Sequence, residues 1–236
     1  MNLLPDRVKR VYLRLIEPVA EWLIRNNVQP NTITTIGTLC SVIGGIIYGT
    51  GHIRTGGWFL GLTALFDVLD GMVARRTNRS SLFGAFYDST LDRVADGFVL
   101  GGLAVFFSTR PGWQGTVMVA VCVLALIGAF VTSYTRARAE ALGIDAKVGL
   151  LQRPERVILL SAPQAFFGLA LDGLVLIGII VLLTITAWVT ALQRVAAVRG
   201  AARREHADAT RAVSDASARA GSARDAAPQR SIVKGE

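Results

Sequence analysis

Two pairs of aspartates stand out because each lies inside a segment that is otherwise apolar enough to enter a membrane. Asp67 and Asp70 are three residues apart, and Asp88 and Asp92 are four residues apart. Both spacings place the two carboxylates of a pair on one face of a helix. A short polar connection, residues 76–81, joins the two segments. We therefore expect antiparallel neighbouring helices whose four carboxylates converge near one end of the pair.

The charge balance of these carboxylates indicates bound metal. Four negative charges in a medium of low dielectric constant need compensation, and Arg75 and Arg93 can neutralise only part of them. Divalent cations would neutralise the rest, and a set of oxygen ligands favours a hard ion such as Mg²⁺, Mn²⁺ or Ca²⁺. Asp96 continues the second stripe by one turn and is expected to pair with Arg93. Two other readings of these residues are an intramembrane salt-bridge cluster and the lining of a transporter's ion pathway.

The chain around the aspartates is predicted to be an all-α, polytopic membrane protein. Of its 236 residues, 52% are hydrophobic, and the mean hydropathy is +0.46 although the C-terminal region is polar. The apolar character is concentrated in residues 30–195, as in a chain that crosses a membrane several times. Six transmembrane helices are expected, at residues 33–50, 58–76, 83–107, 116–134, 157–171 and 174–192.

The two ends of the chain differ from this apolar domain. Residues 5–25 repeat apolar side chains at a helical period but carry too many charges to span a membrane. We therefore expect residues 1–30 to form an N-terminal amphipathic helix that lies in the membrane interface. Residues 31–200 would form the six-helix domain. Residues 201–236 contain few large apolar side chains, which predicts a disordered cytoplasmic tail.

The distribution of basic residues predicts the orientation. Of 25 Lys and Arg residues, all but Arg54 and Arg110 fall in the termini, in two of the connections, or in their flanks. By the positive-inside rule, both termini and the four carboxylates face the cytoplasm, and the expected location is the cell membrane. The net charge of +8 then reflects membrane orientation and attraction to anionic lipid, so no nucleic-acid partner is expected.

The aspartates belong to a longer pattern, Asp-x2-Asp-Gly-x2-Ala-Arg-x8-Gly-x3-Asp-x3-Asp. This pattern resembles the signature of the CDP-alcohol phosphotransferases, membrane enzymes that transfer a phosphate-linked group from a CDP-activated donor to a hydroxyl acceptor and release CMP. The chain has a matching residue at all eight fixed positions, which are Asp67, Asp70, Gly71, Ala74, Arg75, Gly84, Asp88 and Asp92.

The resemblance implies roles for these residues. It makes the four aspartates the ligands of two Mg²⁺ or Mn²⁺ ions per active site, with Asp92 also acting as the general base for the acceptor hydroxyl. It also implies a set of residues that bind the donor, CDP-diacylglycerol, namely Asn31, Gly71, Ala74, Arg75 and Gly84.

The acceptor is predicted from a second group of residues. Residues 133–140 and the stretch Arg153-Pro-Glu-Arg156 are similar to the actinobacterial phosphatidylinositol-phosphate synthases, a branch of the family whose basic cluster receives the phosphate of inositol phosphate. The resemblance therefore implies transfer of phosphatidyl from CDP-diacylglycerol to inositol phosphate. The implied acceptor-phosphate residues are Ser133, Arg136, Arg138, Arg153, Arg156 and Arg194.

A pair of glycines in the third expected span bears on the oligomeric state. Gly97-x3-Gly101 favours close helix association, and members of the family resemble homodimers, so a homodimer surrounded by membrane lipid is expected. Glycerol 3-phosphate is also a phosphorylated acceptor, so a phosphatidylglycerophosphate synthase stays open. More distant alternatives are a cation transporter and a non-catalytic membrane scaffold.

Overall fold

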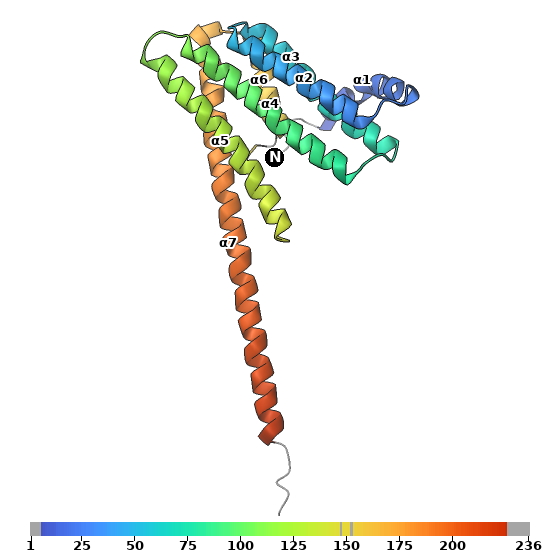
Figure 1. The fold of residues 1–236 in the computed structure, drawn as a ribbon, viewed down its shortest axis with the longest axis vertical. Coiled ribbons are helices and arrows are strands. Elements are labelled where there is room, and N and C mark those ends of the chain that lie inside the picture. Colours follow the sequence, from blue (N-terminus) through green and yellow to red (C-terminus); the bar gives the residue numbers. More distant parts are fainter. Residues whose placement is uncertain (1–5, 147, 152, 226–236) are drawn as a thin grey trace, which may run out of the picture.

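The computed structural model describes residues 6–146, 148–151 and 153–225, and within these ranges it contains helices and no strand (Figure 1). This confirms the all-α prediction. The helices are α1 (Asp6–Arg25), α2 (Pro30–Gly49), α3 (Ile53–Arg76), α4 (Leu82–Ser108), α5 (Trp113–Ala141), α6 (Arg153–Phe167), the 3-10 turn η1 (Ala170–Gly173) and α7 (Leu174–Asp225).

Helix α2 lies between α3 and α4 and packs against both. The prediction that α3 and α4 are direct neighbours is wrong, because α3 packs mainly on α2 and α6, whereas α4 packs on α2 and α5. The reason lies in two adjacent glycines on α2. Gly44 faces the backbone of α3 at Gly56, and Gly45 faces the backbone of α4 at Phe98. Without side chains at these positions, one helix can approach two others closely.

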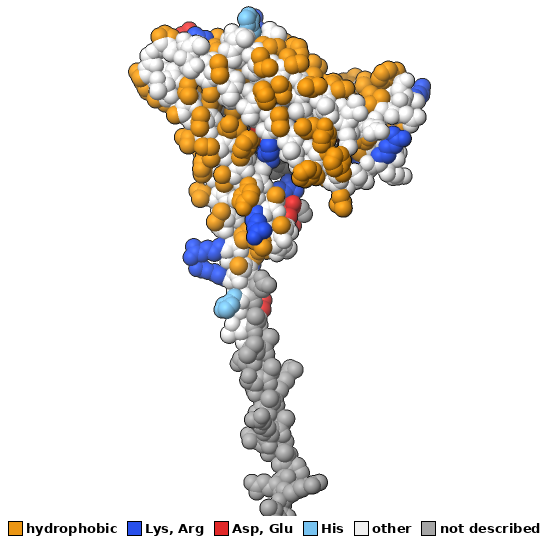
Figure 2. Space-filling view, viewed as in Figure 1, with side chains coloured by type: hydrophobic (Ala, Val, Ile, Leu, Met, Phe, Trp, Pro, Cys, Tyr) orange, Lys and Arg blue, Asp and Glu red, His pale blue; other side chains and the backbone are white. Residues whose placement is uncertain are grey.

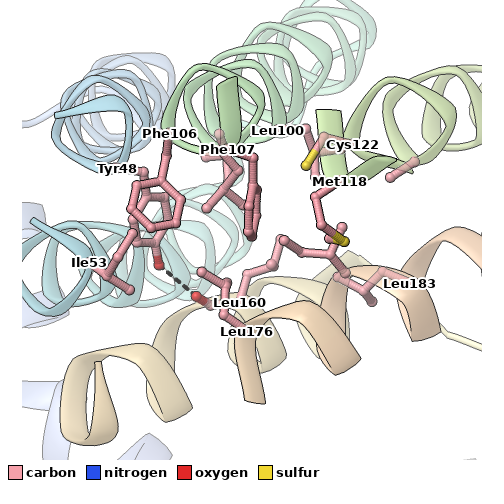
Figure 3. Close-up of a cluster of buried hydrophobic side chains, with 14 of the residues drawn as sticks. Tyr48, Ile53, Leu100, Phe106, Phe107, Met118, Cys122, Leu160, Leu176 and Leu183 are labelled. Carbon is pink, nitrogen blue, oxygen red and sulfur yellow. Dashed lines mark hydrogen bonds between the residues drawn. The ribbon is translucent and has the colours of Figure 1, made fainter. Parts of the chain in front are cut away.

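The central core joins α6 to this group. Tyr48 on α2 is fully buried, and its hydroxyl donates a 2.6 Å hydrogen bond to the carbonyl oxygen of Leu160 on α6 (Figure 3). Phe106 and Phe107 from α4 lie in the same cluster, together with Leu176 from α7. The hydroxyl therefore gives α6 a fixed partner inside an otherwise apolar core.

Helices α5 and α7 form the other side of the bundle. The Thr132 hydroxyl on α5 donates to the carbonyl oxygen of Ala187 on α7 at 2.9 Å. In return, the indole nitrogen of Trp188 on α7 donates to the carbonyl oxygen of Leu124 on α5 at 3.1 Å. These bonds fix how the two helices are aligned along their axes.

Four helical segments of the described chain are long and apolar enough to cross a membrane: α2, α3, α5 and the segment Ala170–Asp208. The six predicted spans correspond in order to α2–α7, but α4 carries the charged residues of the signature, and α6 has 15 residues. A helix of that length rises about 22 Å, less than the roughly 30 Å hydrocarbon core. On the face of the bundle seen in Figure 2, apolar side chains are spread over much of the surface. The count of six spans stays a prediction.

Helix α1 packs against the C-terminal half of α3. Ile16 and Ala20 are buried in a cluster with Leu69 and Val73 of α3, while Leu15 and Trp22 are exposed on the opposite side. A helix with one apolar face on the protein and apolar residues facing outward suits an interfacial position. That position stays a prediction, and residues 1–5 of the predicted segment lie outside the described residues.

The C-terminal region differs from the prediction. Where the sequence predicted disorder from residue 201, α7 continues as a helix through Asp225; residues 226–236 lie outside the described residues. The stretch is rich in Ala and Arg, which have high helix propensity, and extending a helix that already exists needs no new nucleation.

The α2–α4 crossing yields a stability prediction. A Cβ atom on Gly102 would lie 1.9 Å from the carbonyl oxygen of Gly45, so Gly102→Ala must push the two helices apart. We expect it to lower the free energy of unfolding by about 1–3 kcal/mol, measured by thermal unfolding in detergent. Gly178→Ala is the matched control, because a Cβ there meets nothing within 4 Å. Equal stability of the two variants would contradict the proposed packing.

Candidate functional site

The first residue of α6 connects the two acidic helices. Arg153 Nη1 donates a hydrogen bond to Asp67 Oδ2 on α3, and Arg153 Nη2 forms an ion pair with Asp92 Oδ1 on α4 at 2.8 Å. The three side chains are largely buried, with relative exposures of 16%, 25% and 16% in the same order. The sequence did not predict this contact, because 60 or more residues separate Arg153 from each aspartate.

The other two aspartates lie in the same electrostatic environment. Asp70 Oδ2 accepts a 2.7 Å hydrogen bond from the Thr34 hydroxyl on α2. Asp88 lies within Coulombic range of Asp67, Asp70 and Asp92. The four carboxylates are thus gathered at one end of the bundle as the sequence predicted, but α2 and α6 gather them, not direct packing of α3 on α4.

These residues fit a divalent metal by their chemistry. Among the described residues, no three His, Cys, Asp or Glu side chains are arranged closely enough to hold an ion. Instead, a cationic guanidinium stands between two carboxylates of the signature. Carboxylate oxygens are the ligands that Mg²⁺ and Mn²⁺ prefer. In this structure the guanidinium of Arg153 compensates part of the charge of these carboxylates.

Four of the predicted donor-binding residues lie in two contacting pairs, Asn31 with Gly84 and Arg75 with Gly71. A Cβ on Gly84 would lie 3.4 Å from Asn31 Oδ1, so these two residues of α4 and α2 meet at the start of α4. The Gly84 amide also donates to the Ser81 hydroxyl at 3.0 Å, which caps the helix. On α3, the guanidinium of Arg75 folds back over Gly71, with Nη1 3.0 Å from the position of an ideal Cβ.

Ala74 is half-buried beside Arg75, which is exposed. Arg75 lies at the end of α3, reaches over Gly71 and is exposed, so its charge is available to a ligand at this surface.

The predicted acceptor residues lie on three helices, and Arg194 is within Coulombic range of Arg136 and Arg156. Arg136 pairs with Glu140 at 2.9 Å on the exposed end of α5, where Arg138 is also exposed. The Ser133 hydroxyl donates to its own helix at Ala129, 3.0 Å away. Arg194 on α7 donates to the carbonyl oxygens of Val148 and Thr132, so it fastens the segment after α5 to α7.

A buried polar network accompanies Arg153 at the start of α6. Asp96 Oδ2 lies 3.8 Å from Arg93 Nε and 4.0 Å from Arg156 Nη1. The first of these ion pairs confirms the predicted pairing of Asp96 with Arg93. A cavity of about 30 Å³ opens beside the network, with Asp96, Arg153 and Arg156 on its polar side and Leu100 and Leu160 on its apolar side. A cavity of this size accommodates one or two water molecules.

The contacts that two residues make with the signature aspartates were not predicted from the sequence. Thr34 bonds to Asp70, and Arg153 was assigned to the acceptor alone although it binds two signature aspartates. A polar residue on an apolar helix face was the only available signal for Thr34. For Arg153, an arginine at a helix start opposite an excess of acidic residues was the signal.

Comparisons with known proteins agree with the signature. A family model described as CDP-alcohol phosphatidyltransferase matches residues 27–202. The chain is 39% identical over 220 residues to the phosphatidylinositol phosphate synthase of Streptomyces avermitilis, covering 89% of this chain and 87% of that protein. It is 38% identical over 157 residues to the archaetidylinositol phosphate synthase of Methanothermobacter thermautotrophicus, covering 66% and 75% respectively.

Solved structures agree in fold. The crystal structure of Mycobacterium tuberculosis phosphatidylinositol phosphate synthase with CDP-DAG bound matches with a TM-score of 0.70 and 32% identity, covering 78% of this chain and 94% of that chain. The same enzyme in complex with manganese and citrate matches with a TM-score of 0.70 and 32% identity, covering 77% and 87%.

The Thr34–Asp70 hydrogen bond yields a second prediction. Thr34→Val keeps the shape of the side chain but leaves a partly buried carboxylate without its donor. We expect a loss of about 1–3 kcal/mol in the free energy of unfolding, measured by thermal unfolding in metal-free detergent solution. Thr38→Val is the control, because the Thr38 hydroxyl bonds to its own helix at the Thr34 carbonyl oxygen. A smaller loss for Thr34→Val than for Thr38→Val would contradict the interaction.

Proposed function

The chain belongs to the CDP-alcohol phosphatidyltransferase family, and we propose that it transfers the phosphatidyl group of CDP-diacylglycerol to inositol phosphate. The products are phosphatidylinositol phosphate and CMP. One structural observation carries the proposal: the signature aspartates of α3 and α4 meet the arginines that begin α6. This arrangement puts groups suited to a cation and groups suited to an acceptor phosphate side by side. Similarity to phosphatidylinositol phosphate synthases over most of the chain supports the same reaction.

The donor would bind at the cytoplasmic ends of α2, α3 and α4. A relative with CDP-DAG bound shares this fold. Gly71 and Gly84 leave room for the nucleotide against the helices, and the Asn31 amide beside Gly84 can hydrogen-bond to it. Ala74 lies one turn after Gly71 and is half-buried, and its small side chain leaves space for the donor on the same helix face. Arg75, exposed at the end of α3, would bind the donor diphosphate.

The four aspartates would hold two Mg²⁺ or Mn²⁺ ions. A relative was crystallised in complex with manganese, which supports use of a divalent metal. When bound, the ions neutralise the diphosphate and the departing CMP. Asp67, Asp70, Asp88 and Asp92 are the residues of this chain that would hold them.

Asp92 is the proposed general base. It would take the proton from the acceptor hydroxyl, whose oxygen forms a bond to the lipid-linked phosphorus while the bond from that phosphorus to CMP breaks. Its ion pair with Arg153, a proposed acceptor residue, supports this role.

The acceptor phosphate would bind at the start of α6. Arg153 and Arg156 are one turn apart and line the same cavity, so they can act as a fork for an oxyanion. Ser133, Arg136 and Arg138 at the end of α5, and Arg194 on α7, would close around the acceptor from the other side. Arg136 and Arg138 are exposed and can move toward a ligand without unpacking the core.

The proposed enzyme crosses the cell membrane six times, with both termini and the active site in the cytoplasm. The bias of basic residues toward one side supports this orientation. Water-soluble inositol phosphate could then reach the site directly from the cytoplasm.

The proposed enzyme is a homodimer. A Cβ on Gly97 or Gly101 of α4 would meet nothing within 4 Å, so this stripe of α4 has no partner helix within the described chain. A second copy packed there would cover the stripe.

Acceptor profiling tests the reaction. With labelled CDP-diacylglycerol and Mn²⁺ or Mg²⁺, we expect CMP release on addition of inositol phosphate, little with glycerol 3-phosphate, and none after chelation of the metal. Release with glycerol 3-phosphate alone would reject the proposed acceptor. Metal flux in proteoliposomes without CMP release would favour the transporter instead.

One variant tests the proposed general base in this assay, and a second serves as its control. Asp92→Asn removes the proposed base and should lower the rate by about 10²–10⁴-fold. Asp172→Asn lies in the η1 turn with φ of 55°, a conformation that Asn also tolerates, and should keep the rate of the unaltered enzyme.

Crosslinking in native membranes tests the dimer. We expect a dimer band that the double change Gly97→Leu and Gly101→Leu weakens, because both side chains would point into the shared interface. Gly178→Leu, also in open space within the described chain, is the control and should leave the band unchanged. Detection of monomer alone in the unaltered protein would reject the dimer.

A further inference from the structure

The guanidinium of Arg153 lies between two aspartates that, in the proposed function, would bind a divalent metal ion. Its two terminal nitrogens bind one carboxylate oxygen each from Asp67 and Asp92, which lie on different helices. These helices barely contact each other directly, so their carboxylates need a cation to remain close. Asp88 adds further negative charge within Coulombic range of both aspartates. A single guanidinium therefore compensates only part of the charge.

The structure also offers Arg153 a second acceptor. Asp96 Oδ2 is buried and has no hydrogen-bond partner, and Arg153 Nε is buried and has none either. Asp96 and Arg153 line the same cavity of about 30 Å³ and attract each other electrostatically. Arg93 and Arg156 approach Asp96 only to 3.8 and 4.0 Å, too far for hydrogen bonds. A carboxylate oxygen without a hydrogen bond thus lines the same cavity as the arginine.

We propose that Arg153 is a positioning residue that exchanges with the divalent metal. Without metal it holds Asp67 and Asp92 together across α3 and α4; when metal binds these aspartates, the guanidinium turns into the cavity and pairs with Asp96. This inference rests on the proposed function, because it takes the two aspartates as metal ligands.

The exchange would couple metal binding to the acceptor site. Arg156 also lines the cavity, one turn along α6 from Arg153. Turning Arg153 away from the aspartates brings the two guanidinium groups together on the side where the acceptor phosphate is proposed to bind. Both guanidinium groups, those of Arg153 and Arg156, would then face the acceptor phosphate only after the metal has bound.

Metal affinity in the absence of nucleotide and acceptor tests the exchange. Free Mn²⁺ is measured by electron paramagnetic resonance on the full chain in detergent. Arg153→Gln removes the competing cation, so we expect Mn²⁺ to bind roughly tenfold more tightly, within the range common for coupled sites. Arg156→Gln is the comparison on the same helix. Because Arg156 pairs with Asp96 and acts on Asp92 only at longer range, its Mn²⁺ affinity should change much less than that of Arg153→Gln.

An unchanged or weaker affinity in Arg153→Gln would overturn the exchange, because a residue that only supports the site would weaken metal binding when lost. Thermal unfolding without metal checks that the variant is folded. If it is not, Arg153→Lys replaces it, since a lysine offers one point charge where the guanidinium offers two donors. Tighter Mn²⁺ binding is expected for that variant too.

Asp96→Asn tests the second acceptor. It should weaken Mn²⁺ binding severalfold in the otherwise unaltered chain and have a clearly smaller effect in the Arg153→Gln background; equal effects in both backgrounds would overturn the role of Asp96. The proposed function has a separate readout. If Asp88→Asn leaves Mn²⁺ binding unchanged and no CMP is released, the metal site itself fails, whereas normal CMP release without tighter binding in Arg153→Gln rejects only the exchange.

Discussion

The ion pairs of Arg153 with Asp67 and Asp92 are the interaction on which the arrangement of the site depends. Carboxylates in a largely buried position must be paired or bound to metal, because an uncompensated charge in a medium of low dielectric constant costs several kcal/mol or more. Helices α3 and α4 do not pack on each other, so the charge that compensates them has to come from elsewhere. The first residue of α6 supplies it, and its side chain links α6 to the acidic residues of both helices.

Helix α2 provides the complementary constraint within the apolar region. Its adjacent glycines, Gly44 and Gly45, let the backbones of α3 and α4 approach from two sides. Thr34 on the same helix donates to Asp70, and Asn31 lies beside Gly84. One helix therefore fixes the separation of the two acidic helices and contributes polar groups to each of them.

Much of the candidate site was predictable because it depends on local spacing. Separations of three and four residues place Asp67 with Asp70, and Asp88 with Asp92, whatever surrounds the helices. The Asp96–Arg93 pair follows from the same rule. Direct packing of α3 on α4 was predicted wrongly, because a short connection limits the distance between helix ends but not which helix fills the space between them. The tail was also predicted wrongly, because low hydrophobicity was given more weight than the helix propensity of Ala and Arg.

The helical class, the four aspartates and the family signature can be read from the residues alone, since these depend on residue type and on periods of a few residues. That α2 separates the acidic helices and that Arg153 joins them follows only from the packed bundle. It also showed that Arg136 and Arg194 have protein partners of their own. Contacts between residues far apart in the chain depend on which backbones can approach closely and on which charges must be compensated once water is removed. Those two conditions are set by the packed bundle as a whole.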